Sequence, residues 1–371
     1  MSLLRSKIAT TVENISNVKD QRVLVNDAIE IALNRVYQHY DWPYYLDSKN
    51  GIITTIDDYT TGTLTATAAS KTLTGNASTV WASAMVGRKI RIGSEKTFYR
   101  IAAVGGVNDI TLDTAYIGDG GAGLTYAIYK DEYRLNANVD KYKTIRQMQN
   151  GVPMFDMTPT SFDKILPAPQ NFADPVYNVL VGTNLDVYTT GTVTSSTSTL
   201  TGVSTAWTSV EGLGRGSQIL IGSNVYTVKS VTSDTVLTTY EVMSNHAGAT
   251  YEIKLNNLVV QVYQLPNAAR ILMYRYFRQP EPLVNDTDLP DMPYEFHWLL
   301  IYGALSIVWQ HKGDKVNQVE AEQRFLNGLE MMKVKLGSFA PDRITARKSV
   351  DRLRKNYRAV ENSNYDRKYS A

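Results

Sequence analysis

The stretch Thr61-Gly62-Thr63-Leu64-Thr65 recurs later in the chain as Thr190-Gly191-Thr192-Val193-Thr194. The similarity continues downstream, because the two copies share further short matches in the same order. These are Leu73-Thr74-Gly75 with Leu200-Thr201-Gly202, Trp81 with Trp207, Gly87-Arg88 with Gly214-Arg215, Ile92-Gly93-Ser94 with Ile221-Gly222-Ser223, and Tyr126 and Ile128 with Tyr251 and Ile253. An internal repeat of this kind predicts two copies of one structural unit.

Both copies have the pattern of short antiparallel strands. Thr, Val, Tyr and Ile alternate along them and are interrupted by clusters of Gly, Asn, Asp and Ser, which are typical of turns. Two copies this far apart do not form a solenoid, which stacks adjacent repeats at a fixed short period. We therefore expect two homologous inserted all-β modules, residues 61–129 and 190–254, each a small barrel or sandwich. Trp81 and Trp207 are the expected anchors of their cores.

The segments between and after the modules, residues 130–189 and 255–290, also contain candidate strands. The clearest lie at residues 258–263 and 271–277, where β-branched and aromatic residues are concentrated. We expect these segments to form a central antiparallel β framework that carries the two modules.

The N-terminal end of the chain has a helical pattern instead. Apolar residues recur every three or four positions from Val25 to Tyr40, and Pro43 ends the pattern because it cannot continue the helical hydrogen bonds. Asp20 is a candidate N-cap for this helix. A shorter helix is expected before it, carried by Leu4, Ile8, Thr11, Val12 and Ile15.

The C-terminal part predicts two more helices. The first is apolar nearly all round, covers residues 294–312 and ends at Gly313. Asp314 is the expected cap of the second, whose expected buried stripe is Phe325, Leu326, Leu329, Met332 and Leu336. Residues 1–60 and 291–340 should thus form one helical bundle, and the chain as a whole is expected to have an α+β fold.

The composition is that of a globular chain. A chain of 371 residues is too long for one ordinary core, and 43% of its residues are hydrophobic. The net charge of +2 excludes a chain-wide positive field for nucleic acid, and the absence of cysteine excludes disulfides and thiolate zinc sites. The longest apolar run, between Phe296 and Trp309, is shorter than the roughly 20 residues of a membrane span. The N-terminus lacks the apolar core of a secretory signal, so we expect neither a transmembrane helix nor export.

Residues 341–371 form a basic tail with few apolar residues. Nine basic and four acidic side chains give it a balance of +5, which leaves −3 for the rest of the chain. Such a segment is expected to be extended until it meets a partner surface. Since Tyr and Arg are enriched at protein interfaces, docking on a protein is at least as good an interpretation as binding to DNA. The candidate docking residues are Arg343, Arg347, Lys348, Arg352, Arg354, Lys355, Arg358 and Tyr357.

A search for catalytic or metal-binding patterns gives no residues to name. Gly118-Asp119-Gly120-Gly121-Ala122-Gly123 satisfies the spacing of a dinucleotide-binding loop, but a strand follows it instead of a helix, which favours a turn. The histidines His39, His246, His297 and His311 lie apart from one another, without the spacing of a metal site. Asn285-Asp286-Thr287-Asp288 lacks the glycine and glutamate of a calcium loop and favours a turn. We therefore expect no enzyme activity, no cofactor and no metal.

One stretch resembles the head–tail adaptor proteins of tailed bacteriophages. It runs from Tyr274-Arg275-Tyr276-Phe277-Arg278-Gln279-Pro280-Glu281-Pro282-Leu283 through Asp286 and Asp288 to Leu289-Pro290-Asp291-Met292-Pro293-Tyr294-Glu295-Phe296-His297-Trp298-Leu299-Leu300. The N-terminal helix followed by Tyr40-Asp41-Trp42-Pro43-Tyr44 is similar to the frame of those proteins, and the two modules are similar to insertions found in some of them.

This resemblance implies a structural virion protein made in the bacterial host cytoplasm and located at the head–tail junction. It implies a ring, commonly of twelve copies, that sits below the portal protein, extends the DNA channel without reading the DNA sequence and offers a surface to tail or nozzle proteins. The basic C-terminal segment of the chain, residues 341–371, would dock on the portal. Two alternatives remain open: a tail or baseplate hub whose β-modules bind other tail proteins or host glycans, and an enzyme that acts on the cell wall.

Overall fold

The computed structural model describes residues 3–18, 21–95, 97–149, 151, 153–165 and 172–337. These residues fold into a mixture of helices and mostly antiparallel strands, which confirms the expected α+β class. The chain divides into two units. The helical unit consists of the residues up to Tyr45 and those from Pro280 onward, and the β unit is Leu46–Gln279. The tail, residues 341–371, and the expected cap Asp20 lie outside the described residues.

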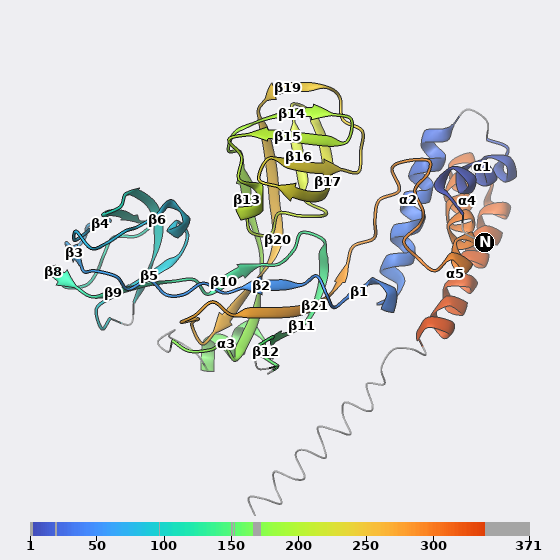
Figure 1. The fold of residues 1–371 in the computed structure, drawn as a ribbon. Helices are drawn as coiled ribbons and strands as arrows, with labels where there is room; N and C mark the ends of the chain where they lie inside the picture. The colour runs from blue at the N-terminus through green and yellow to red at the C-terminus, as the bar shows by residue number, and fades with distance from the viewer. Residues whose placement is uncertain are drawn as a thin grey trace, which may run out of the picture. The chain divides into compact units, whose positions relative to one another are not determined.

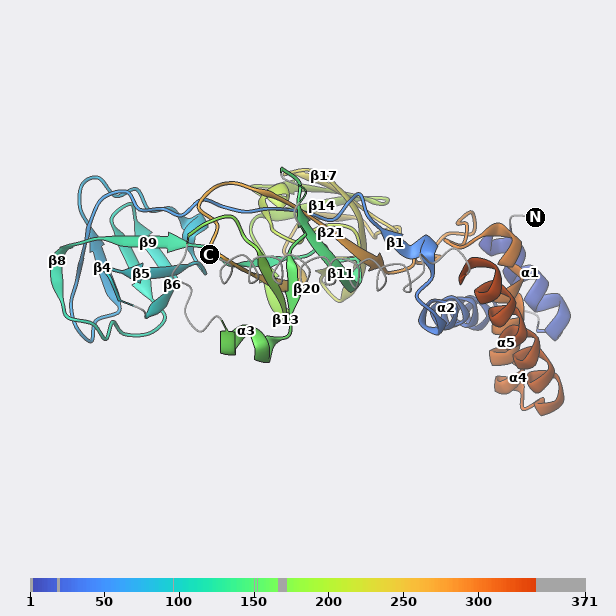
Figure 2. The ribbon, with the colours of Figure 1, turned by 90° about the horizontal axis from the view of Figure 1, so that it is seen from below.

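The helical unit contains four described α-helices that pack together, as Figures 1 and 2 show. They are α1 (Arg5–Ser16), α2 (Arg22–His39), α4 (Trp298–Lys312) and α5 (Lys315–Gly337), with short 3₁₀ turns η1 (Pro43–Tyr45) and η4 (Tyr294–Phe296). The expected end of α4 and the expected start of α5 are confirmed, whereas α4 begins at Trp298 and not at residue 294, since residues 294–296 form η4. Gly313 adopts a left-handed conformation (φ 74°) after α4, and the Asp314 side chain accepts a hydrogen bond from the Asn317 backbone at the start of α5.

The helices approach closely where a glycine replaces a larger residue. A Cβ atom on Gly303 of α4 would lie 2.8 Å from Ala32 and 2.9 Å from the Phe325 ring, so any side chain there would separate the helices. The buried face of α5 consists of Ala321, Phe325, Gly328, Leu329 and Met332. The expected stripe was wrong at Leu326, which is 44% exposed because it lies to the side of this face.

The β unit contains a seven-stranded sheet in which the path of pairing is β8-β3-β4-β7-β6-β5-β9. It corresponds to the first repeat, and we call it module 1. Its strands are β3 (Leu64–Ala66), β4 (Thr72–Gly75), β5 (Lys89–Ile92), β6 (Phe98–Gly106), β7 (Asp109–Leu112), β8 (Gly121–Leu124) and β9 (Tyr126–Tyr129), with the 3₁₀ turn η2 (Ser83–Met85).

The second repeat, module 2, follows the path β19-β14-β15-β18-β17-β16-β20. Each strand of module 2 occupies the same place in this path as its equivalent strand does in the path of module 1. Its strands are β14 (Thr192–Ser196), β15 (Thr199–Val203), β16 (Gln218–Ile221), β17 (Asn224–Ser233), β18 (Val236–Thr239), β19 (His246–Ala249) and β20 (Tyr251–Tyr263), with the 3₁₀ turn η3 (Trp207–Ser209). Within the described residues, the two repeats therefore form the same arrangement of strands (Figure 1).

The structure corrects one match between the repeats. Gly87 has φ 84°, and its N–H donates to Ile101 O at 2.8 Å; Gly216 has φ 90° and donates to Val228 O at 2.9 Å. Gly87 therefore corresponds to Gly216, and not to Gly214 as the Gly-Arg pairs suggested. The mismatch of two residues arises because the left-handed position before β5 or β16, and not the neighbouring arginine, is what the fold requires.

A framework sheet region joins the modules. Strand β21 (Ile271–Arg278) pairs with β1 (Leu46–Asp47), β2 (Ile52–Thr54) and β11 (Val139–Gln147), all antiparallel. Strand β20 continues from module 2 into the framework, where it pairs with β13 (Tyr177–Tyr188) and β10 (Glu132–Arg134). The remaining elements are β12 (Phe155–Met157), which is parallel to β13, and the short helix α3 (Pro159–Ile165).

Candidate functional site

The two predicted core anchors lie in equivalent surroundings. Trp81 is 2% exposed and Trp207 is 0% exposed, each inside the apolar core of its module. The Trp81 Nε1–H donates to Tyr126 Oη at 3.0 Å, and that hydroxyl donates to the Thr61 carbonyl at 2.5 Å. This arrangement satisfies the polar atoms of two buried aromatic side chains and connects them to the segment that precedes β3.

Module 2 has the same chain of hydrogen bonds. The Trp207 Nε1–H donates to Tyr251 Oη at 3.0 Å, and Tyr251 donates to the Thr190 carbonyl at 2.6 Å. In both modules the tryptophan and tyrosine rings meet edge to face, with their centroids 5.8 Å apart in module 1 and 6.1 Å apart in module 2. A tyrosine placed on a core strand was the functional partner that sequence reasoning missed, although the matched Tyr126 and Tyr251 were its signal.

The other patterns that the sequence singled out have structural roles. The glycine-rich stretch contains strand β8, which pairs with β3, so it is partly a strand and not only the expected turn. His297 is 2% exposed; its Nδ1 accepts from the Leu3 backbone at 3.1 Å and its Nε2 contacts the Met292 carbonyl at 3.0 Å. Burial lowers the pKa of His297, which fits the neutral ring that these two contacts require.

Asp288 closes the turn that was expected at residues 285–288. Its carboxylate accepts hydrogen bonds from the backbone of Val284 at 2.9 Å and of Asn285 at 2.6 Å.

Over the part of the chain that the structure describes, no group of three or more acidic, histidine or cysteine side chains is arranged to hold a metal ion. None of the described helices is both long and apolar enough to cross a membrane. The predicted docking residues of the tail, from Arg343 to Arg358, lie outside the described residues.

The candidate functional surface of the helical unit is an apolar groove between α4 and α5, which we call the α4–α5 groove. It consists of two adjoining hollows of about 660 Å³ and 440 Å³ that share Trp298, Asn327 and Met331. Met331 is 63% exposed and Val334 is 75% exposed. Neither residue belongs to the buried face of α5, so their exposure is not explained by packing within the described unit.

The groove has a rigid floor and a charged rim. Gly328 allows α4 to approach, because a Cβ atom there would meet Leu299 and the Trp298 ring at 2.5 Å or less. At one end, Arg324 stacks over the Tyr302 ring at 5.4 Å and donates to its hydroxyl at 3.0 Å. At the other end, Lys335 forms an ion pair with Glu295. An apolar centre within a polar rim is the usual anatomy of a protein–protein interface.

Comparison with known proteins gives one family. No curated protein matches the chain. A family model described as SU10 adaptor protein matches residues 4–350, a range that contains all the described helices and both β modules. The chain therefore belongs to the SU10 adaptor protein family.

Proposed function

We propose that this protein is the head-to-tail adaptor of a tailed bacteriophage: a structural virion protein that forms a ring below the portal, extends the DNA channel and provides the surface to which the tail attaches. The observation that carries the proposal is the family match, which extends from the first described helix through both modules. The ring would be a homo-oligomer, commonly of twelve copies, and DNA would pass through it without sequence recognition. No enzymatic step, cofactor or metal is part of the proposal.

The α4–α5 groove supports the self-assembly part of this proposal. Burying a side chain such as Met331 or Val334 contributes roughly 1.5–3 kcal/mol, so repetition of the contact around a ring would stabilise it substantially. The occupant that we propose is the helical unit of a neighbouring copy. The charged side chains at the two ends of the groove, Arg324 at one and the Glu295–Lys335 pair at the other, would then fix the register of the contact.

The experiment compares two charge insertions in the full-length protein. Met331→Glu with Val334→Glu places two carboxylates in the groove and should abolish rings in negative-stain images and in sedimentation velocity. Ile31→Glu is the matched control, because Ile31 is an exposed apolar residue of α2 (48%) that does not line the groove. Normal rings from the groove variant would contradict the assigned interface, and the absence of rings from the unmodified protein, with and without portal, would contradict the proposed function.

The basic tail is the proposed contact with the portal. Deletion of residues 342–371 should leave ring formation intact and abolish attachment to purified portal, since the candidate residues Arg343 to Arg358 are removed together. If the truncated protein still occupies portal vertices, the tail is not the docking segment.

For the β unit, we propose that the two modules arose by duplication of one unit that was inserted into the adaptor framework. Their equivalent strand order and their equivalent Trp–Tyr–Thr hydrogen bonds support this origin. A second candidate function for this unit is contact with other tail proteins. It is favoured by Leu185 (75% exposed) and Val187 (52% exposed), which lie on one face of β13.

A further inference from the structure

Strand β13 is paired along one edge and open along most of the other. Its full length, Tyr177 to Tyr188, lies opposite β20 (Figure 1). Among the strands that the structure describes, only β12 pairs with the opposite edge, and it reaches no further than Val179. Residues 180–188 therefore form a strand edge with no neighbouring strand in the described part of the chain, and we call them the β13 edge.

Backbone groups of alternate residues point into this open edge. The Val262 N–H donates to the Asp131 carbonyl at 2.8 Å, so even-numbered residues of β20 point their backbone groups toward β10, and the odd-numbered ones toward β13. Across the register, these odd-numbered residues pair with even-numbered residues of β13 from position 182 onward. The N–H and C=O groups of Thr183, Leu185 and Val187 consequently face away from β20.

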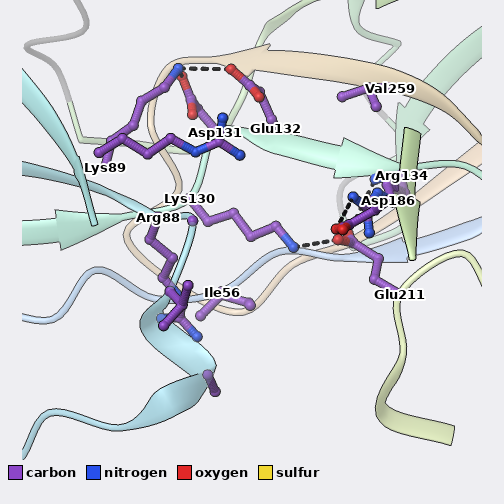
Figure 3. Close-up of a pocket in the computed structure, with 14 residues that line it drawn as sticks. Ile56, Arg88, Lys89, Lys130, Asp131, Glu132, Arg134, Asp186, Glu211 and Val259 are labelled. Atoms are coloured by element: carbon purple, nitrogen blue, oxygen red, sulfur yellow. Dashed lines mark hydrogen bonds and ion pairs between the residues drawn. The ribbon is translucent and has the colours of Figure 1, made fainter. Parts of the chain in front are cut away.

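The side chains of the β13 edge are exposed and mostly apolar. Val181 is 51% exposed, Leu185 75% and Val187 52%. Asp186 is the only charged residue of the edge, and Arg134 of β10 neutralises it at 2.7 Å, as Figure 3 shows. The Asp186 carboxylate also accepts a hydrogen bond from the Val187 N–H at 3.1 Å, as expected of an N–H that is not paired with β20. The edge thus combines apolar side chains with backbone groups that no described strand satisfies.

The β13 edge lacks the features that usually protect an open strand from association. Such strands are kept short, or carry lysine, proline or bulges. Strand β11, the last strand of its own sheet, follows this rule: it carries Lys141, Lys143 and Arg146, and its pairing with β21 is interrupted twice. The β13 edge contains neither lysine nor proline, and its one irregularity lies at its beginning, before Gly182. A long apolar edge without such protection is a site where another strand adds.

From these observations we propose that the β13 edge receives an extended, apolar segment of another virion protein, which adds to the sheet as a further strand. A polypeptide backbone supplies hydrogen-bond donors and acceptors at the same spacing as Thr183, Leu185 and Val187. Alternate apolar side chains of the added strand would lie beside those of Leu185 and Val187. The inference rests on the proposed function and gives it a mode of contact with tail proteins.

A second copy of this chain is a poorer occupant of the edge. Pairing of β13 with the β13 of a neighbour makes a two-fold contact, which joins two copies and cannot continue around the proposed ring. Strand β11, the other long edge strand among the described residues, is protected by its basic residues. The ring would therefore leave the β13 edge free for a different protein.

The chain has no cysteine, so one introduced thiol reports the exposure of one position. The test compares the rate of maleimide labelling of Val187→Cys in the purified full-length protein with its rate in complete virions that contain the variant. We expect labelling to be on the order of tenfold slower in virions, because an added strand covers the thiol. Val225→Cys is the matched control, since Val225 is 55% exposed on β17, and its labelling should be equally fast in both.

Equal labelling of Val187→Cys in the two preparations would overturn the proposal. So would slow labelling already in the purified protein, which would assign the edge to a neighbouring copy or to another part of the same chain. Absence of this protein from purified virions would instead contradict the proposed function.

A backbone variant separates strand addition from coverage of the side chains alone. Leu185→Pro, combined with Val187→Cys, removes an N–H that faces the open edge and keeps the pairing with β20, since proline is tolerated at such positions of edge strands. The thiol in virions should then be labelled as fast as in the purified protein, whereas Leu185→Val, which keeps the N–H, should preserve the protection. Unchanged exchange of the β20 amides in the purified variants verifies that the sheet is intact. If the thiol stays protected beside Leu185→Pro, the edge is covered without backbone pairing, and strand addition is wrong.

Discussion

The two β-modules have the same internal architecture but different attachments to the framework. Inside, each has the same strand order and a buried tryptophan that donates to a tyrosine, which in turn donates to a threonine carbonyl. At the boundary, module 2 shares the 13-residue strand β20 with the framework, whereas β9 of module 1 ends after four residues at Tyr129. The residues that the two copies share encode the module, and residues that they do not share encode its attachment.

The attachment of module 1 relies on side chains instead of a continuous strand. Lys89 is ion-paired with Asp131, which is only 3% exposed at its side chain and also accepts a hydrogen bond from Gln261 at 2.8 Å. Tyr129 packs edge to face against Phe172 at 5.8 Å. A joint of this kind can open without breaking a sheet, whereas module 2 cannot open without fraying β20.

The largest expected effect comes from removing the core tryptophans. Trp81→Ala and Trp207→Ala should each destabilise their module by about 3–5 kcal/mol, because each leaves a large cavity. Hydrogen–deuterium exchange should show that Trp81→Ala deprotects β3 to β9 alone. Trp207→Ala should deprotect β14 to β19 and also β13 and β20 of the framework, because β20 belongs to both.

Each tryptophan variant serves as the control of the other. If Trp81→Ala deprotects β20 as strongly as Trp207→Ala does, the two modules are coupled to the framework equally. The contrast drawn from the continuity of β20 would then be wrong.

A smaller effect is expected from the ion pair that attaches module 1. Lys89→Met leaves the buried Asp131 carboxylate with Gln261 as its neutral partner, which should cost about 1–3 kcal/mol. Neighbouring carboxylates Asp131 and Glu132 raise the pKa of Lys89 in spite of its burial, a sign that they stabilise its charge. Local exchange of β5 and β10 measures the loss.

The matched control for this change is Gln218→Met, since Gln218 holds the equivalent position in module 2 and is exposed. It should change the exchange of β16 by less than about 0.5 kcal/mol. Equal effects of the two substitutions would mean that the charge of Lys89 contributes nothing to the attachment of module 1.

The sequence predicted those parts of the fold that depend on neighbouring residues. Periodicity indicated the four helices, and the left-handed Gly313 and the capping Asp314 marked where two of them end and begin. The repeat indicated which tryptophans are equivalent. The correspondence of Gly87 with Gly216 was missed, because the Gly-Arg pair in both copies suggested Gly214 as the equivalent residue.

Features that depend on distant segments could not be predicted. Predicting the α4–α5 groove requires knowing that Met331 and Val334 lie beside Trp298 of α4 and outside the buried face that contains Phe325 and Met332. A charged cleft of the β unit (Figure 3) combines Arg88 with residues as distant as Asp186 and Glu211. Which charges meet is decided by topology, and a single sequence carries no local signal for it.

The smallest expected effect concerns the tyrosines that the modules share, and it is visible only at high pH. Burial raises the pKa of Tyr126 to about 12 and that of Tyr251 to about 12, against an ordinary value of 10. Since the folded pKa is the higher one, each phenol contributes stability that is fully present below pH 10 and is lost as the pH rises toward 12.

Tyr126→Phe should therefore flatten the alkaline loss of protection in module 1 alone, and Tyr251→Phe that in module 2 alone, measured as the slope of local exchange stability against pH. The slope is the proper quantity, because both variants also leave a tryptophan N–H without its acceptor and so lower stability at every pH. An unchanged slope in the module that carries the substitution would show that its tyrosine does not ionise on unfolding in this range, and that the shared hydrogen bonds do not control the alkaline limit of the modules.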